Sequence, residues 1–318
     1  MRVPHLSPEA YRRVTLVAAI LLAIIIVTGG AVRLTDSGLG CPVGLSCPAR
    51  ELHRVAVSSE HRFIEHANRL FTGAVSIAVI VAVLGSLVRI PRRRDLTLLA
   101  LGLVAGVFAQ AVLGQLTVEF DLKPGFVMAH FLVSIVLLTN AIWLYWRAGQ
   151  PDGATETRRI VSARLVTMSR VLLVSAAAVL VTGTVVTGAG PHSGGGQHDN
   201  VARLDIKVES AARVHGTLVM LFLALVLATL WLVRRDRAPA SVQTRLTVLL
   251  VVLVAQAGVG YAQYFSDIPP LLVGIHIAGA AAVWSATLVF ALGCFARTAP
   301  AIAGDPPGEQ SPSLLARA

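Results

Sequence analysis

The chain has 318 residues, of which 55% are hydrophobic and only 14% charged, and its mean hydropathy is +0.73. This composition is too apolar for a soluble domain of this size, whose surface would carry many more charged residues. The net charge of +10 does not require a nucleic-acid partner, and we expect none, because the cytoplasmic Lys and Arg residues of a membrane protein produce the same excess.

Eight apolar runs follow one another along the chain, each long enough to cross a bilayer, which takes about 20 residues. They lie near residues 14–34, 63–88, 97–118, 125–146, 169–189, 211–233, 246–265 and 271–296. The sequence therefore predicts an all-α membrane protein with eight transmembrane helices and no room for a soluble catalytic domain. The first run lacks the cleavage site of a signal peptide, so we expect it to be retained.

Lys and Arg residues accumulate in alternate connections between these runs. They are frequent in residues 1–13, 89–95, 147–170 and 234–245 and sparse in the connections between. Since such residues favour the cytoplasmic side, this pattern predicts a multi-pass protein of the cell (plasma) membrane with both termini in the cytoplasm.

The two halves of the chain resemble each other. Residues 109–114 match residues 255–260, and the glutamine in each stretch precedes a histidine by 20 positions, His130 and His276 respectively. Val27–Gly29 likewise recurs as Val181–Gly183. We therefore expect two repeat-related four-helix bundles of the same orientation. The predicted parts are an N-terminal half over 1–150, a C-terminal half over 151–296 and a disordered tail over 297–318, with 147–170 serving only as a joint.

The second apolar run begins with a polar cluster, residues 60–69. Helical spacing puts His61, Glu65 and Asn68 on one face, with His66 about 100° away. Charges at a helix start can reach interfacial water, and this reading stays open for the first residues of the cluster. Glu65 precedes a long apolar stretch, and a carboxylate there could bind a cationic intermediate, relay protons or act as a nucleophile.

Three histidines, His130, His215 and His276, lie inside predicted helices, each within about two turns of the outer end. Ionisable groups are costly in lipid, so we expect these side chains to face the bundle interior and to serve a function. Two histidines on facing helices suit the axial positions of a heme iron, whereas zinc or copper usually takes a third or fourth protein ligand. His215 and His276 form such a pair in the C-terminal half.

The three cysteines divide into a pair and a single residue. Cys41 and Cys47 lie in the first outer loop, where the compartment favours a disulfide; a structural staple and an electron relay both remain open. Cys294 is expected to be a small apolar filler near the end of the last helix. His192 and His198, in the glycine-rich outer loop, receive no role.

In this order the motifs resemble those of the heme A synthase family, integral membrane enzymes that oxidise the C8 methyl of heme O to the formyl group of heme A. The resemblance covers roughly residues 14–296. Its carriers are Thr28–Leu34, the Cys41 and Cys47 loop, Glu65–Arg69, His130, Gly188–His192, Arg213–Gly216 and Gly274–His276. Each motif is weak alone, and their order makes the resemblance specific.

The resemblance implies a heme b cofactor between His215 and His276 and substrate heme O in the N-terminal half. The residues implied for the substrate side are His130, Asn68 and Arg69, with Glu65 as the essential catalytic carboxylate and Cys41–Cys47 as a disulfide. The implied reaction is two successive hydroxylations followed by loss of water, using oxygen and an external electron donor, with the active site in the outer half of the membrane. Implied partners are a heme O synthase and terminal oxidase assembly factors; a homo-oligomer stays open.

One position departs from the family pattern. The usual motif is Glu-x-x-His-Arg, but here the stretch from Glu65 to Arg69 has Asn68 where the histidine is expected. Three readings remain open: His130 alone holds the substrate heme, His61 or His66 takes over, or the second ligand is not needed for turnover.

Two other functions compete with this interpretation. A membrane cytochrome that carries electrons through paired histidines would need neither Glu65 nor the cysteine pair. A small-molecule transporter is favoured by the repeat, but its broken helices and charges at the membrane midplane are absent from the sequence.

Overall fold

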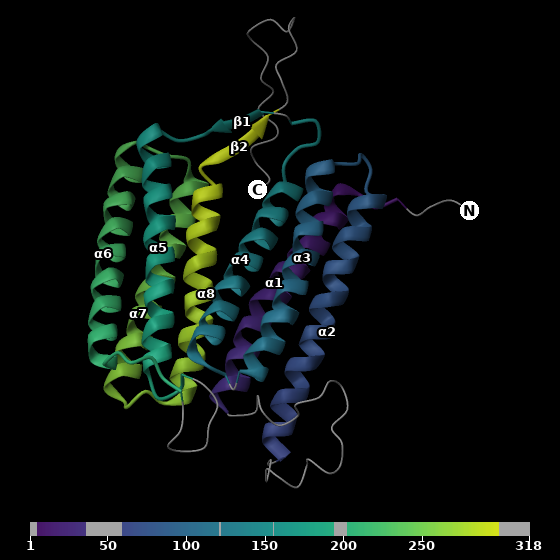
Figure 1. Ribbon diagram of the computed structural model, residues 1–318. Helices are drawn as coiled ribbons and strands as arrows, with labels where there is room; N and C mark the ends of the chain where they lie inside the picture. The colour runs from purple at the N-terminus through teal and green to yellow at the C-terminus, as the bar shows by residue number, and fades with distance from the viewer. Residues whose placement is uncertain (1–4, 36–58, 121, 155, 194–201, 299–318) are drawn as a thin grey trace, which may run out of the picture.

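The structure is a computed structural model that describes residues 5–35, 59–120, 122–154, 156–193 and 202–298 (Figure 1). Within the second helix, the side chains of residues 59–62 and 65 also lie outside the description.

In the part of the chain that the structure describes, eight helices are long and apolar enough to cross a membrane, as the sequence predicted. They are α1 (Pro8–Leu34), α2 (Ser59–Val88), α3 (Arg94–Glu119), α4 (Pro124–Ala148), α5 (Ala163–Ala189), α6 (Val208–Arg235), α7 (Ala240–Phe265) and α8 (Pro270–Leu292). Many large apolar side chains, including Phe63, Leu98, Val174 and Trp231, are exposed on their outer faces. Such a surface is what lipid contact requires, so the all-helical membrane fold is confirmed.

Six of the described helices, all except α4 and α8, begin three to six residues before the predicted apolar runs because their first turns contain polar residues. Ser162, for example, caps α5: its side-chain oxygen accepts a hydrogen bond from the backbone N–H of Leu165 at 3.4 Å. Ser7 caps α1 in the same way through Ala10, at 3.2 Å. A cap satisfies backbone donors that the helix itself leaves unpaired, so these helices extend past the apolar stretch into the interface.

The helices pack in two rings of four. In one, α1 packs on α2, α2 on α3, α3 on α4 and α4 on α1; in the other, α5 to α8 do the same. This places α2 diagonally across from α4, and α6 across from α8. The two groups, on the right and left of Figure 1, meet through α1 and α4 on one side and α8 and α5 on the other. The repeat relation and the side of the membrane on which the termini lie remain predictions.

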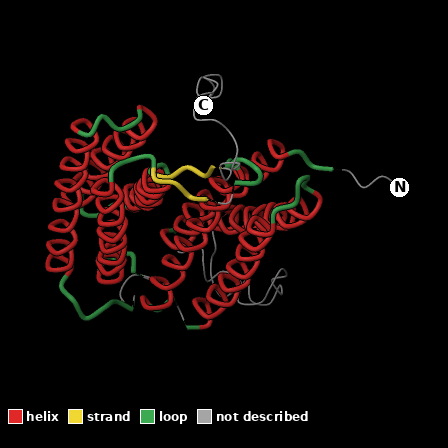
Figure 2. The backbone as a smooth tube through the Cα atoms, turned by 90° about the horizontal axis from the view of Figure 1, so that it is seen from above, coloured by secondary structure: helices red, strands yellow, loops and turns green. Residues whose placement is uncertain are grey.

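Two short strands correct the sequence prediction for the joint and for the end of the last helix. β1 (Glu156–Arg159) pairs antiparallel with β2 (Phe295–Thr298), with Glu156 opposite Thr298. The last helix ends at Leu292 rather than at residue 296, and the joint takes part in a sheet rather than only connecting. Figure 2 shows the strands lying over the boundary between the helix groups. We call this side of the molecule the strand end.

The strand end also carries a network of partly buried ion pairs. Arg89 is 1% exposed, and its guanidinium binds the Asp152 carboxylate at 2.7 Å. Asp95 accepts from Arg93 at 2.9 Å and also from Arg147. These pairs join the start of α3 to the end of α4 and to the joint, so charge is concentrated at the end opposite the histidines.

Candidate functional site

His215 and His276 face each other, as the sequence predicted. His215 lies in the second turn of α6 and His276 in the second turn of α8, at the end of the bundle that we call the histidine end. Their ring centres are 6.5 Å apart, and the ring planes are inclined by 66°. Both residues are half-buried.

Glycines on the neighbouring helices let the two rings lie in this position. A Cβ atom at Gly183 on α5 would be 3.1 Å from Cε1 of His215, and one at Gly260 on α7 would be 3.0 Å from Cε1 of His276. These distances are shorter than ordinary van der Waals contact. Each ring therefore lies against the backbone of the next helix, and a larger residue would push it toward the other ring.

Polar contacts fix the two histidines further. Thr182 Oγ1 lies 3.2 Å from Nδ1 of His215, a hydrogen bond whose direction depends on the tautomer. Gln256 Nε2 donates to the backbone carbonyl of His276 at 2.9 Å. With Nδ1 of His215 engaged by Thr182, the other ring nitrogen of His215 is left to act as a ligand.

The geometry of the pair suits a metal ion whose other ligands come from a cofactor and not from the protein. A metal bonded to one nitrogen of each ring at about 2.0–2.1 Å, with each ring centre roughly 1.1 Å beyond that nitrogen, separates the ring centres by about 6.3 Å. The observed separation is 6.5 Å. Among the described residues, no group of three or more His, Cys, Asp and Glu could hold a metal ion. Two imidazoles without further protein ligands fit a heme iron, whose porphyrin supplies the remaining four.

His130 lies on α4 in surroundings that match those of His276. Gln110 Nε2 donates to the backbone carbonyl of His130 at 3.0 Å and to Ser134 Oγ at 2.5 Å. A Cβ atom at Gly114 would be 3.6 Å from Cε1 of His130. The Nδ1 atoms of His130 and His276 are both buried without a hydrogen-bond partner among the described residues. The sequence match between the third and seventh helices therefore corresponds to similar contacts at the two histidines.

Asn68 on α2 has a threonine neighbour, as His215 has on α6. Thr28 Oγ1 donates to Asn68 Oδ1 at 2.9 Å, just as Thr182 contacts the His215 ring. His66, one of the alternatives for the missing histidine, is exposed, whereas Asn68 is half-buried. His66 therefore does not share the inward face of Asn68.

Several predicted site residues lie outside the description. These are Cys41, Cys47 and His198, together with the side chains of His61 and Glu65. The described residues contain no disulfide, so the Cys41–Cys47 pairing stays a prediction. Arg69 is half-buried on α2.

Cys294 follows α8 and is fully buried, in agreement with the expectation of an apolar filler. Burial raises the pKa of its thiol to about 11. It lies at the strand end, away from the histidines.

Sequence reasoning missed the residues that contact the histidines and Asn68. Thr28, Thr182 and Gly183 stood out only as a repeated Val-Thr-Gly motif, and Gln110 and Gln256 only as repeat markers. Their spacing signalled the repeat, but their contacts depend on helix packing.

His192 received no role from the sequence. Its Nε2 atom lies 3.0 Å from the carbonyl oxygen of Ile268, and this contact links the connection after α5 to the connection before α8.

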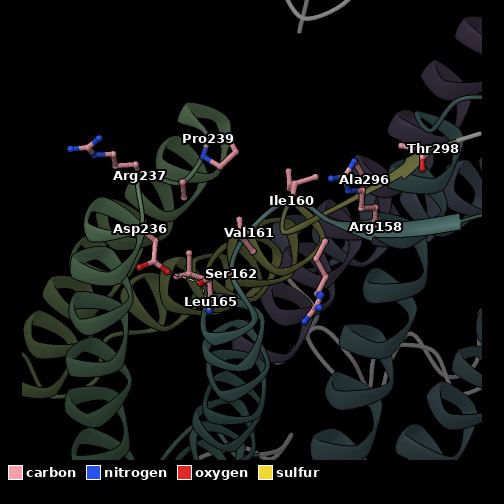
Figure 3. Close-up of a pocket in the computed structure, with 12 residues that line it drawn as sticks. Arg158, Ile160, Val161, Ser162, Leu165, Asp236, Arg237, Pro239, Ala296 and Thr298 are labelled. Atoms are coloured by element: carbon pink, nitrogen blue, oxygen red, sulfur yellow. Dashed lines mark hydrogen bonds between the residues drawn. The ribbon is translucent and has the colours of Figure 1, made fainter. Parts of the chain in front are cut away.

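A groove of about 550 Å³ lies at the strand end and contains none of the predicted site residues (Figure 3). Its wall includes Ser162, whose hydroxyl donates to the Asp236 carboxylate at 2.6 Å. The groove is formed where α5 and α7 begin and α6 ends, far along the helices from His215. It is therefore separate from the histidine pair.

The sequence is similar to proteins of known families. A family model described as cytochrome oxidase assembly protein (COX15-CtaA) matches residues 50–192. The heme A synthase of Listeria welshimeri is 27% identical over 154 residues, or 48% of this chain and 50% of the relative. That of Exiguobacterium sibiricum is 30% identical over 173 residues, or 53% and 56%. That of Caulobacter sp. strain K31 is 27% identical over 327 residues, or 86% and 93%.

The chain thus spans about half the length of the Listeria and Exiguobacterium relatives that it matches. The family match begins before α2 and reaches the Gly188–His192 motif, so it includes Asn68 and His130. Together, the family model and the relatives confirm the resemblance to heme A synthases that was read from the motifs.

Proposed function

We propose that this protein is a heme A synthase, an oxidoreductase of the plasma membrane that oxidises the C8 methyl of heme O to the formyl group of heme A for a terminal oxidase. The observation that carries the proposal is the His215–His276 pair, with ring centres 6.5 Å apart and a glycine behind each ring. The family match and the relatives named heme A synthase support it.

In this proposal the C-terminal half holds heme b through His215 and His276. The bound heme supplies one-electron transfer. Thr182 keeps one ring nitrogen of His215 engaged, so the ring presents the other nitrogen to the iron. Gly183 and Gly260 keep both rings close to the neighbouring helices, which leaves the space between them for the cofactor.

The N-terminal half binds the substrate, heme O, with His130 as its ligand. The two halves touch at the level of the histidines: a Cβ atom at Gly30 on α1 would lie 3.0 Å from Cδ1 of Ile277, the residue after His276. Close packing here brings the substrate and cofactor pockets near each other and excludes water between them. A short separation favours electron delivery from one pocket to the other.

The reaction replaces two C–H bonds of the methyl group through two hydroxylations, and the resulting gem-diol loses water to give the aldehyde. Oxygen and an external donor supply the oxidant and the electrons. Glu65, charged within the outer half of the membrane, stabilises positive charge that develops on the substrate. Arg69 and the Cys41–Cys47 disulfide support the same half of the site, and a heme O synthase and oxidase assembly factors are the expected partners.

The porphyrin content of the purified full chain tests this function. We expect heme O or heme A together with heme b when the protein is produced in cells that make heme O, measured by chromatography of the extracted porphyrins. Heme b alone, with no heme A formed despite a supply of heme O, would instead identify an electron-carrying cytochrome.

Replacing Glu65 with Gln keeps the shape of the side chain and removes its charge. We expect Glu65→Gln to abolish heme A formation, with heme O or a hydroxylated intermediate accumulating, while the low-spin heme b spectrum stays intact. Glu60→Gln, one turn nearer the helix start, is the matched control and should retain activity. Normal heme A production by Glu65→Gln would remove the carboxylate from the mechanism.

A further inference from the structure

Asn68 and His215 are held by equivalent neighbours in the two halves. Thr28 contacts Asn68 at 2.9 Å, and Thr182 contacts His215 at 3.2 Å. The glycine after each threonine faces the same side chain: a Cβ atom at Gly29 would lie 4.0 Å from Asn68 Oδ1, and one at Gly183 would lie 3.1 Å from the His215 ring. The two positions therefore have the same kinds of neighbour, although the glycine lies closer to His215 than to Asn68.

The helix across the bundle also corresponds. His130 on α4 and His276 on α8 each receive a glutamine hydrogen bond on the backbone carbonyl, at 3.0 and 2.9 Å. Since α2 lies diagonally across from α4 as α6 does from α8, Asn68 takes the place opposite His130 that His215 takes opposite His276. The N-terminal half thus repeats the histidine site with one ligand replaced by an amide.

An asparagine in this position does not substitute for a histidine ligand. The amide oxygen of Asn68 already accepts the hydroxyl hydrogen of Thr28. The amide nitrogen only donates and has no lone pair for a metal. Its two N–H groups have no acceptor among the side chains that the structure describes. Since Thr28 binds the amide oxygen, these N–H groups are the part of the Asn68 side chain that is available to a ligand.

We propose that the N-terminal half holds its heme through His130 alone, and that Asn68, oriented by Thr28, directs its N–H donors to the open side of the iron as a binding site for a small ligand. This inference rests on the proposed function for the presence of a heme in that half. The ligand class is a diatomic molecule or small anion with an acceptor atom, such as carbon monoxide or azide. An N–H donor favours ligands that carry negative charge.

The amount of bound carbon monoxide measures the number of open heme positions, because carbon monoxide binds a ferrous heme that lacks a sixth ligand. The test uses the full chain in detergent, loaded with excess hemin, freed of unbound heme and reduced. We expect two hemes per chain and about one bound carbon monoxide, from the heme with a single histidine. Asn68→His should abolish carbon monoxide binding and add a low-spin heme.

The reciprocal variant is His215→Asn, which copies the N-terminal arrangement into the C-terminal half. It should raise the carbon monoxide bound to about two per chain. In Asn68→His, the unchanged spectrum of the His215–His276 heme shows that the protein is folded.

Asn68→Leu separates the open position from the amide donor. The variant should bind carbon monoxide at the wild-type stoichiometry, while the azide affinity of the ferric protein falls by roughly 2- to 12-fold, the value of one net hydrogen bond. An unchanged azide affinity would remove the donor role of Asn68.

Three results would overturn the single ligation by His130: two low-spin hemes without carbon monoxide binding, an N-terminal half that takes up no hemin, or carbon monoxide binding that survives Asn68→His. An azide affinity unchanged by Asn68→Leu would overturn the donor role of Asn68. The proposed function fails separately, if the wild-type protein with both hemes bound never converts heme O to heme A. The outcomes of the two experiments are therefore distinguishable.

Discussion

At the scale of single residues, the histidines depend on small and polar neighbours. Gly183 and Gly260 leave no side chain between the rings and the adjacent helices, and Thr182 engages one ring nitrogen. Buried imidazoles without such partners would be costly in lipid. The geometry of the pair is thus a property of four helices rather than of the two that carry the ligands.

Removing either ligand of the pair should remove the low-spin state of the cofactor. We expect His215→Ala and His276→Ala each to abolish the low-spin heme b spectrum, because one imidazole leaves the iron with a single axial ligand. Optical spectra of the purified reduced protein measure this. His192→Ala is the control, since His192 bonds the Ile268 carbonyl in the connection before α8 and is not one of the two proposed ligands, and it should keep the full spectrum. Retention of the spectrum in both ligand variants would show that the assignment is wrong.

The cysteines should differ in their reaction with thiol reagents. The pKa of Cys294 is about 11, so at pH 8 roughly one molecule in a thousand carries the reactive thiolate. We expect Cys294 to resist alkylation in the folded protein and to react more readily as the pH rises toward 11, or after denaturation. Mass spectrometry after alkylation measures each site.

The same measurement tests the Cys41–Cys47 disulfide. Both thiols should become available only after reduction, while Cys294 reports whether the protein has stayed folded. Free Cys41 and Cys47 in freshly isolated, unreduced protein would contradict the pairing.

At the scale of secondary-structure elements, the strand end joins segments that are far apart in the chain. β1 precedes α5 and β2 follows α8, and the backbone N–H of Arg297 donates to Gln150 Oε1 at 3.1 Å. Asp95 links the start of α3 to the end of α4 through Arg147. The joint between the halves is therefore held at both of its ends.

Neutralising Asp95 should destabilise the protein without affecting the heme pair. Asp95→Asn leaves Arg93 and Arg147, whose side chains are 10% and 15% exposed, without their shared carboxylate. We expect a loss of about 1–3 kcal/mol in the free energy of unfolding, measured by denaturant titration. Glu9→Gln breaks a pair whose partners are 76% and 77% exposed and should cause no measurable change. Equal effects of the two variants would contradict the structural role of Asp95.

At the scale of the whole molecule, the two groups of helices meet along α4 and α8 as well as α1. Trp284 on α8 packs against both hydrophobic cores, and its indole N–H donates to Thr139 Oγ1 on α4 at 2.8 Å. Gly30 provides the close approach of α1 to α8 near the histidines. Contact between the groups is therefore made both at the histidine end and within the bilayer.

A double-mutant cycle measures the contact between the groups. Trp284→Phe and Thr139→Val should each lower the free energy of unfolding, and the coupling between them should be about 0.5–1.5 kcal/mol, as for one net hydrogen bond. Trp231→Phe is the control, because Trp231 is exposed and lies in neither core. Additive effects of Trp284→Phe and Thr139→Val would show that the hydrogen bond does not join the halves.

The eight spans and the three inward histidines were predictable from the sequence, because in lipid each helix must satisfy its own backbone hydrogen bonds. Length, apolarity and the cost of an ionisable group are then local properties of each segment. The 6.5 Å approach of His215 to His276, the match of Asn68 to His215 and the pairing of β1 with β2 depend on tertiary packing. Each of these features requires a particular rotation and crossing of helices that are separated by dozens of residues in the chain. The rotations and crossings are set by contacts such as Thr28 with Asn68 and Gly30 with Ile277, and no local sequence pattern specifies those contacts.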